Sequence, residues 1–143
     1  MAPPPAGPIE TNVFIHAQTT DHLSAECRRF LDAVANERIA ATLAPLVLHE
    51  LSYVLTRVRP ELMRAPVAGY MVSVVAWPGI QADKPLLTDA IQRCGARSDL
   101  GFVDAYLAAL ATRQSCPVYT KNVRDLVGQG VSVPDPLPDG STP

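Results

Sequence analysis

Apolar residues recur at intervals of three and four along much of the chain, the spacing that gives an α-helix one buried face. In residues 21–36, Leu23, Cys27 and Phe30 fall on one such face, with charged residues mostly elsewhere. The pattern predicts helices at residues 21–36, 45–59, 60–75, 84–94 and 102–114. Because Pro66 and Gly69 interrupt the third of these helices, we expect a break or a kink there.

Short apolar and partly β-branched runs lie between the predicted helices. They predict a first strand that ends at Ile9, a turn into a short strand at residues 77–81, and further strands at residues 38–43, 117–120 and 131–133. Strands separated by helices are typical of the α/β class, with a parallel sheet covered by helices on both faces. In such folds ligands bind in the crevice above the carboxyl ends of the strands.

Proline is concentrated at the two ends of the chain. The sequence predicts a disordered proline-rich segment at residues 1–7 and a flexible proline-rich tail at residues 134–143, because proline cannot donate ladder hydrogen bonds. The compact domain is then residues 8–133. Within 143 residues, 48% of them hydrophobic, one domain with a substantial core is expected.

Charge and cysteine content narrow the functional classes. The net charge is −2, so binding to a nucleic acid would need a local basic patch or a bound metal. Three widely spaced cysteines suit a reducing compartment better than a disulfide framework. The chain shows neither a signal peptide nor an apolar run long enough to cross a membrane, so we expect a cytoplasmic protein without membrane partners.

Three acidic residues stand at positions where catalytic chemistry is common. Glu10 follows the first predicted strand, Glu50 lies at the edge of the apolar stripe of helix 45–59, and Asp104 lies in the first turn of helix 102–114. Each has a purely structural alternative. Glu50 could form a salt bridge with Arg57 on the same flank, and Asp104 could cap its own helix.

A further polar cluster, Thr120 with Asn122, directly follows the predicted strand at residues 117–120. Glu10, Glu50, Asp104 and Asn122 would therefore present oxygen atoms near strand ends or helix starts. Carboxylate and carbonyl oxygens are the ligands that Mg²⁺ prefers, and such sites usually act on phosphates.

With these residues in view, the chain resembles a PIN domain, the metal-dependent ribonuclease fold of VapC-type toxins from toxin–antitoxin pairs. Four short segments carry the resemblance, in the order that the family has them: Ile9–Ile15, Leu48–Leu51, Phe102–Ala111 and Val118–Leu126. They span nearly the whole predicted domain.

The resemblance implies a doubly wound parallel sheet of strand order 3-2-1-4-5 with an acidic pocket above it. It implies that Glu10, Glu50 and Asp104 are catalytic and bind the metal, that Asn122 is a further ligand, and that Asn12 and Thr120 support them. Mg²⁺ or Mn²⁺ would orient the scissile phosphate and activate a water molecule that breaks the RNA phosphodiester bond.

The resemblance also implies partners. Arg57, Lys121 and Arg124 could contact the RNA backbone. A VapC-type toxin would be made with a small antitoxin protein whose C-terminal segment covers the acidic pocket, and it would form a homodimer.

The sequence departs from the family pattern at three places. The first acid is Glu10 instead of aspartate, the fourth position is the neutral Asn122, and prolines continue up to Pro8 where apolar residues usually lead into the first strand. These departures keep alternatives open beside the endoribonuclease. One is a PIN-fold module with weakened catalysis that binds RNA or protein. The other is an unrelated doubly wound domain whose acids only cap helices.

Overall fold

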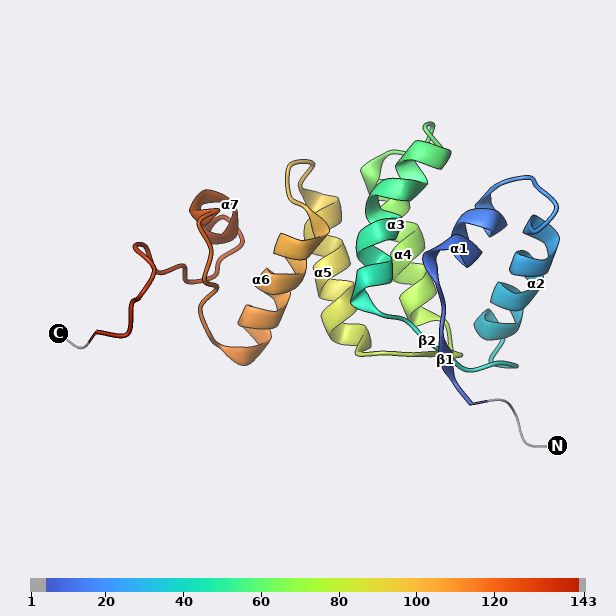
Figure 1. Ribbon diagram of the computed structural model, residues 1–143, viewed down its shortest axis with the longest axis horizontal. Helices are drawn as coiled ribbons and strands as arrows, with labels where there is room; N and C mark the ends of the chain where they lie inside the picture. Colours follow the sequence, from blue (N-terminus) through green and yellow to red (C-terminus); the bar gives the residue numbers. More distant parts are fainter. Residues whose placement is uncertain (1–4, 142–143) are drawn as a thin grey trace.

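The computed structural model describes residues 5–141 and contains seven helices and three short strands in that range (Figure 1). The disorder predicted for residues 1–4 lies outside the described residues. The elements are β1 (Gly7–Pro8), α1 (Thr11–Gln18), α2 (Ser24–Ala35), β2 (Ala41–Thr42), α3 (Pro45–Val58), α4 (Arg64–Ala76), β3 (Ile80–Gln81), α5 (Lys84–Ala96), α6 (Phe102–Gln114) and α7 (Val123–Val127). Figure 1 shows an elongated molecule, with β1 and α2 toward one end and α7 toward the other.

The sheet is parallel, with β2 between β1 and β3. Gly7 pairs with Ala41, and Ala41 pairs with Ile80 on the other side. These strands fall where the sequence predicts the first three, and the α/β class is confirmed. β1 begins at Gly7, the last residue of the segment for which we predict disorder.

The structure does not show the full strand order 3-2-1-4-5. Residues 117–120 and 131–133, predicted as the fourth and fifth strands, have no strand structure and are not part of the sheet. The two segments still lie side by side, because the Val118 N–H donates a hydrogen bond to the Ser132 carbonyl at 2.9 Å. The order β1-β2-β3 is therefore the part of the prediction that the structure contains.

Pro8 gives a physical reason why the sheet ends at β1. Ile9 donates its N–H to the Thr42 carbonyl of β2 at 3.1 Å. Because the backbone N–H and C=O groups of consecutive strand residues point to opposite sides, the backbone of Pro8 faces away from β2, toward the outer edge of the sheet. Proline has no N–H to donate there, and within sheets it is confined to edge strands. A fourth strand beside β1 would lack that hydrogen bond.

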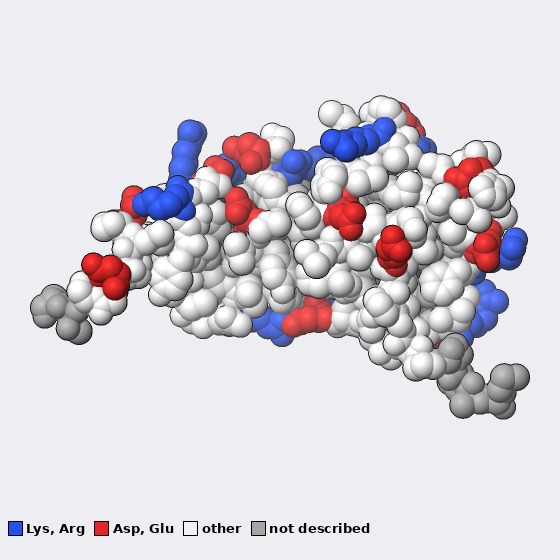
Figure 2. Space-filling model, in the orientation of Figure 1, with Lys and Arg blue, Asp and Glu red and all other residues white. Residues whose placement is uncertain are grey.

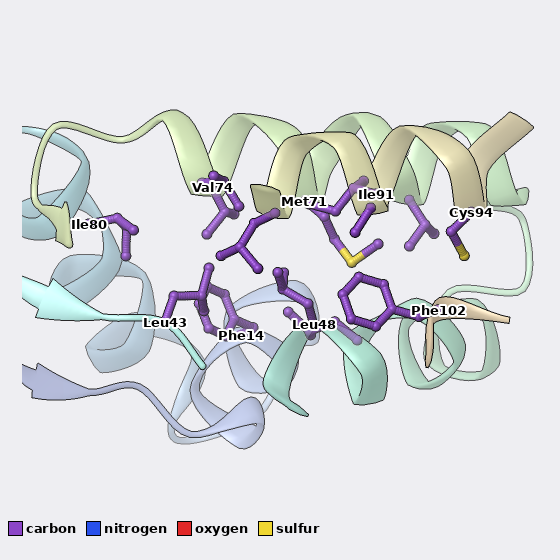
Figure 3. Close-up of a cluster of buried hydrophobic side chains, with 14 of the residues drawn as sticks. Phe14, Leu43, Leu48, Met71, Val74, Ile80, Ile91, Cys94 and Phe102 are labelled. Carbon is purple, nitrogen blue, oxygen red and sulfur yellow. The ribbon is translucent and has the colours of Figure 1, made fainter. Parts of the chain in front are cut away.

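Two hydrophobic clusters hold the helices together. Figure 3 shows the larger one, in which Leu48 of α3 lies between Phe14 of α1 and Phe102 of α6. The smaller cluster joins α6 to the C-terminal segments through Ala108, Ala111, Val118, Leu126 and Val131. Helix α6 thus buries a different face in each cluster, and its alanines allow the close approach on both sides.

Two helices begin later than the sequence predicts. Helix α2 starts at Ser24 instead of residue 21, because Asp21 accepts a hydrogen bond from the Leu23 N–H at 2.8 Å and organises the preceding turn. Helix α4 starts at Arg64 instead of residue 60, which places Pro66 in its first turn, where a missing N–H costs no helical hydrogen bond. Within residues 5–141, no helix combines the length and the apolar character needed to cross a bilayer.

Candidate active site

Glu10 occupies the short connection between β1 and α1. Its backbone is extended, with φ −78° and ψ 151°, and it is the residue that precedes the first turn of α1. The side chain is exposed. The structure therefore places this carboxylate at the carboxyl end of β1, the position that the sequence predicts.

Thr11 connects α1 to the second acid. Its side chain is buried, and its hydroxyl donates a hydrogen bond of 3.1 Å to Glu50 Oε1 on α3. The two residues are far apart in the sequence, and Thr11 is not among the predicted site residues. The feature of the sequence that indicates a role for Thr11 is its place directly after Glu10, at the start of a helix.

Glu50 itself is exposed on α3 and does not form the alternative salt bridge with Arg57. No Glu50–Arg57 pair occurs among the ion pairs of residues 5–141. The Arg57 guanidinium instead lies over the ring of Tyr53, 5.7 Å from its centroid. The carboxylate of Glu50 is thus held by the Thr11 hydroxyl and not neutralised by that arginine.

Asp104 lies half-buried in the first turn of α6 and accepts a hydrogen bond of 2.8 Å from the Asn122 side chain. A carboxylate in the first turn also benefits from the helix dipole. The bond to Asn122 distinguishes Asp104 from a residue that only caps its own helix. It brings together two of the four predicted ligands. They lie on α6 and on the C-terminal segment, which the smaller hydrophobic cluster packs against each other.

Thr120 supports this pair from the backbone side. Its hydroxyl oxygen accepts a hydrogen bond of 2.9 Å from the Asn122 N–H, a local turn that fixes the start of α7. The structure therefore places Thr120 beside Asn122.

Two arginines of the α5 region attach the segment of α7 to the rest of the fold. Arg97 binds both carboxylate oxygens of Asp99 at 3.1 and 2.9 Å and reaches Asp125 of α7 at 3.4 Å. Its guanidinium holds the pKa of Asp99 below its usual value. Arg93 donates to the Gln129 carbonyl just after α7 at 3.0 Å. These contacts keep Asn122 within reach of Asp104.

No side-chain hydrogen bond joins Asn12 to Glu10 in the described residues. Asn12 is exposed and lines a pocket of about 410 Å³ between α1 and α2, together with His16 and Cys27. The structure thus shows no hydrogen bond for the supporting role predicted for Asn12.

Of the four predicted ligands, Asp104 and Asn122 are joined by a hydrogen bond. Glu50 is instead bonded to Thr11, the residue that follows Glu10. Within residues 5–141, no three His, Cys, Asp or Glu side chains converge closely enough to hold a metal ion. The oxygen chemistry of the donors suits a hard cation. The spacing of these side chains in this structure does not suit a bound cation.

The helices that carry the two acids nevertheless meet. The rings of His49 on α3 and Phe102 on α6 lie 6.4 Å apart between centroids. Glu50 is the residue after His49, and Asp104 lies two residues after Phe102. A small displacement of α6 relative to α3 would therefore change the separation of the two carboxylates directly.

Of the predicted RNA contacts, Lys121 forms an ion pair with Asp135, Arg57 lies over Tyr53, and Arg124 is exposed on α7. Figure 2 shows basic and acidic side chains interspersed along the upper edge of the molecule, with further separate acidic side chains below them in the middle of the view. The basic side chains offer cationic contacts for a polyanion despite the net charge of −2.

The family model described as "PIN domain" matches residues 9–124, from the end of β1 into α7. No curated protein matches the chain. The matched range contains Glu10, Glu50, Asp104 and Asn122.

Proposed function

The chain belongs to the PIN domain family, and on that premise we propose that it is a metal-dependent endoribonuclease that cleaves RNA phosphodiester bonds. Membership in this family indicates nuclease-like activity. The observation that carries the proposal for this chain is the hydrogen bond between Asp104 and Asn122. It fixes a half-buried carboxylate on α6, a helix that packs against α3, the helix that carries Glu50.

The proposed metal is Mg²⁺ or Mn²⁺, and the proposed ligands are Glu10, Glu50, Asp104 and Asn122. Because Glu10, Glu50 and Asp104 do not converge in the structure, the proposal requires α3 and α6 to bring them together when metal and RNA bind. The packing of His49 on Phe102 supports this requirement to the extent that it makes the two helices neighbours.

We further propose that the nuclease acts in the cytoplasm as a VapC-type toxin of a toxin–antitoxin pair. This subtype extends the family membership, which the family model supports over residues 9–124. A small antitoxin protein would cover the exposed Glu10 and Glu50, and the toxin would form a homodimer. Arg57, Lys121 and Arg124 are the proposed contacts to the RNA backbone.

The first test is cleavage of a mixed RNA pool by the purified protein with Mg²⁺, with Mn²⁺ and with EDTA. We expect cleavage with either ion and intact RNA in EDTA, because the proposed metal would orient the scissile phosphate and activate the attacking water. If a demonstrably folded protein leaves RNA intact with both ions, the proposal fails. A module that binds RNA or protein without cutting would then explain the family membership better.

A second prediction concerns the length of the first acid. Glu10→Asp should raise the rate of cleavage about 10-fold, because removing one methylene shortens a side chain in a site where Mg²⁺ demands near-ideal geometry. The measurement is the cleavage rate at saturating Mg²⁺ beside Glu26→Asp, the same change on an exposed residue of α2. An unchanged or lower rate for Glu10→Asp would show that the site is built for glutamate.

A further inference from the structure

Tyr53 is a large aromatic side chain exposed next to the candidate active site. It lies one helical turn after Glu50 on α3 and is 42% exposed. The buried face of α3 is formed by Leu48, Leu51 and Leu55, so core packing does not require an aromatic residue at this position. Helical side chains three residues apart are neighbours, which puts the ring beside the Glu50 carboxylate.

Neighbouring aromatic rings hold Tyr53 in place. His49 packs on it edge to face, with ring centroids 5.4 Å apart and planes at 65°. His49 in turn lies against Phe102, and Phe102 stacks on Tyr106 at 6.3 Å. This row of rings runs from the exposed face of α3 to the first turn of α6, the helix of Asp104. The ring of Tyr53 is therefore held beside Glu50 on α3 and connected through His49 to α6.

Arg57 adds a cation to this exposed ring. Its guanidinium lies 5.7 Å from the ring centroid, and its side chain is exposed. An arginine stacked on an aromatic ring offers a flat surface for a base and a positive charge for a phosphate. Single-stranded nucleic acids are bound in this way, by aromatic side chains that stack on bases and cations that follow the backbone.

We propose that Tyr53 and Arg57 form a stacking platform for an unpaired nucleobase of the RNA substrate, beside the bond that is cut. This inference rests on the proposed function and specifies its substrate. A base in a double helix is already stacked on both sides, so the platform selects single-stranded RNA.

The test uses a single-stranded oligoribonucleotide with one 2-aminopurine, whose fluorescence is quenched when the base stacks. Binding is measured with Mg²⁺ in the Asp104→Asn protein, where cleavage does not interfere. Tyr53→Leu should weaken binding about 10-fold and remove the quench, whereas Tyr53→Trp should retain both, because any aromatic ring can stack. Tyr119→Leu, which removes another exposed tyrosine, should leave the quench unchanged.

In the active protein, Tyr53→Leu should raise KM for single-stranded RNA while kcat changes less. Equal effects of Tyr53→Leu and Tyr119→Leu would overturn the platform. So would cleavage by the parent protein with no change in quench or KM for Tyr53→Leu, an outcome that leaves the proposed nuclease intact and favours a protein-binding role for this face. A parent protein that neither binds nor cleaves RNA would instead refute the proposed function itself.

Discussion

Asp104→Asn is expected to lower the rate of RNA cleavage about 100-fold or more while the protein stays folded. Asparagine has nearly the same shape and can still accept the hydrogen bond from Asn122, which is 2.8 Å long in the structure. Only the negative charge is lost. Even residues that merely support metal ligands typically cost roughly 10- to 100-fold in activity or metal affinity when they are replaced, so loss of a proposed ligand should exceed that range.

The matched control is Asp32→Asn on α2, an exposed aspartate that is not among the proposed metal ligands. It should leave the cleavage rate unchanged. Circular dichroism and the thermal midpoint of both variants should match those of the parent protein, which separates loss of chemistry from loss of structure. Full cleavage activity in Asp104→Asn would show that Asp104 is not part of the active site. It would also be the result if the cleavage came from a contaminating ribonuclease.

Gly79→Ala should destabilise the protein by about 3 kcal/mol or more, at the upper end of what overpacking costs. Gly79 lies just before β3, where a Cβ atom would stand 2.3 Å from the Val34 carbonyl oxygen and 2.4 Å from that of Ile39. Both neighbours are backbone atoms. Val34 cannot move away freely, because its carbonyl accepts the Gly79 N–H at 3.1 Å.

The comparison is Gly69→Ala in the interior of α4, where an added Cβ meets no atom within 4 Å. That change should stabilise the protein by about 0.5–1 kcal/mol, because alanine loses less conformational entropy in a helix. The free energy of unfolding in urea measures both variants. Similar stability of Gly79→Ala and the parent protein would mean that the junction between α2 and β3 is looser than the structure indicates.

Five of the seven helices in residues 5–141 could be predicted from the sequence because their periodic patterns are long, whereas the shorter α1 and α7 were not predicted. The prediction for residues 102–114 coincides with α6, and that for 45–59 exceeds α3 by one residue. The strands were harder. Short apolar runs such as residues 117–120 indicate an extended backbone, but they do not indicate which neighbouring segment accepts and donates its hydrogen bonds. Here that neighbour is Ser132 instead of the sheet.

The roles of the candidate site residues stay predictions, and their contacts could not be read from the sequence. Asp104 and Asn122 lie in separate predicted elements, and the structure joins them by a hydrogen bond. The bond between Thr11 and Glu50 spans 39 positions of sequence, and a choice between Thr11 and Asn12 depends on helix orientation. Consecutive helical residues point about 100° apart, so the neighbour of a candidate residue can face a different element.

The proline at the outer edge of β1 has a consequence for how copies of the chain meet. An unpaired strand edge is a template on which other chains can add strands and aggregate. In this protein the edge at β1 is two residues long, and Pro8 has no N–H group to donate from it. The open sheet is thus protected against edge-to-edge growth, and molecules at high concentration should associate through side-chain surfaces instead of shared backbone.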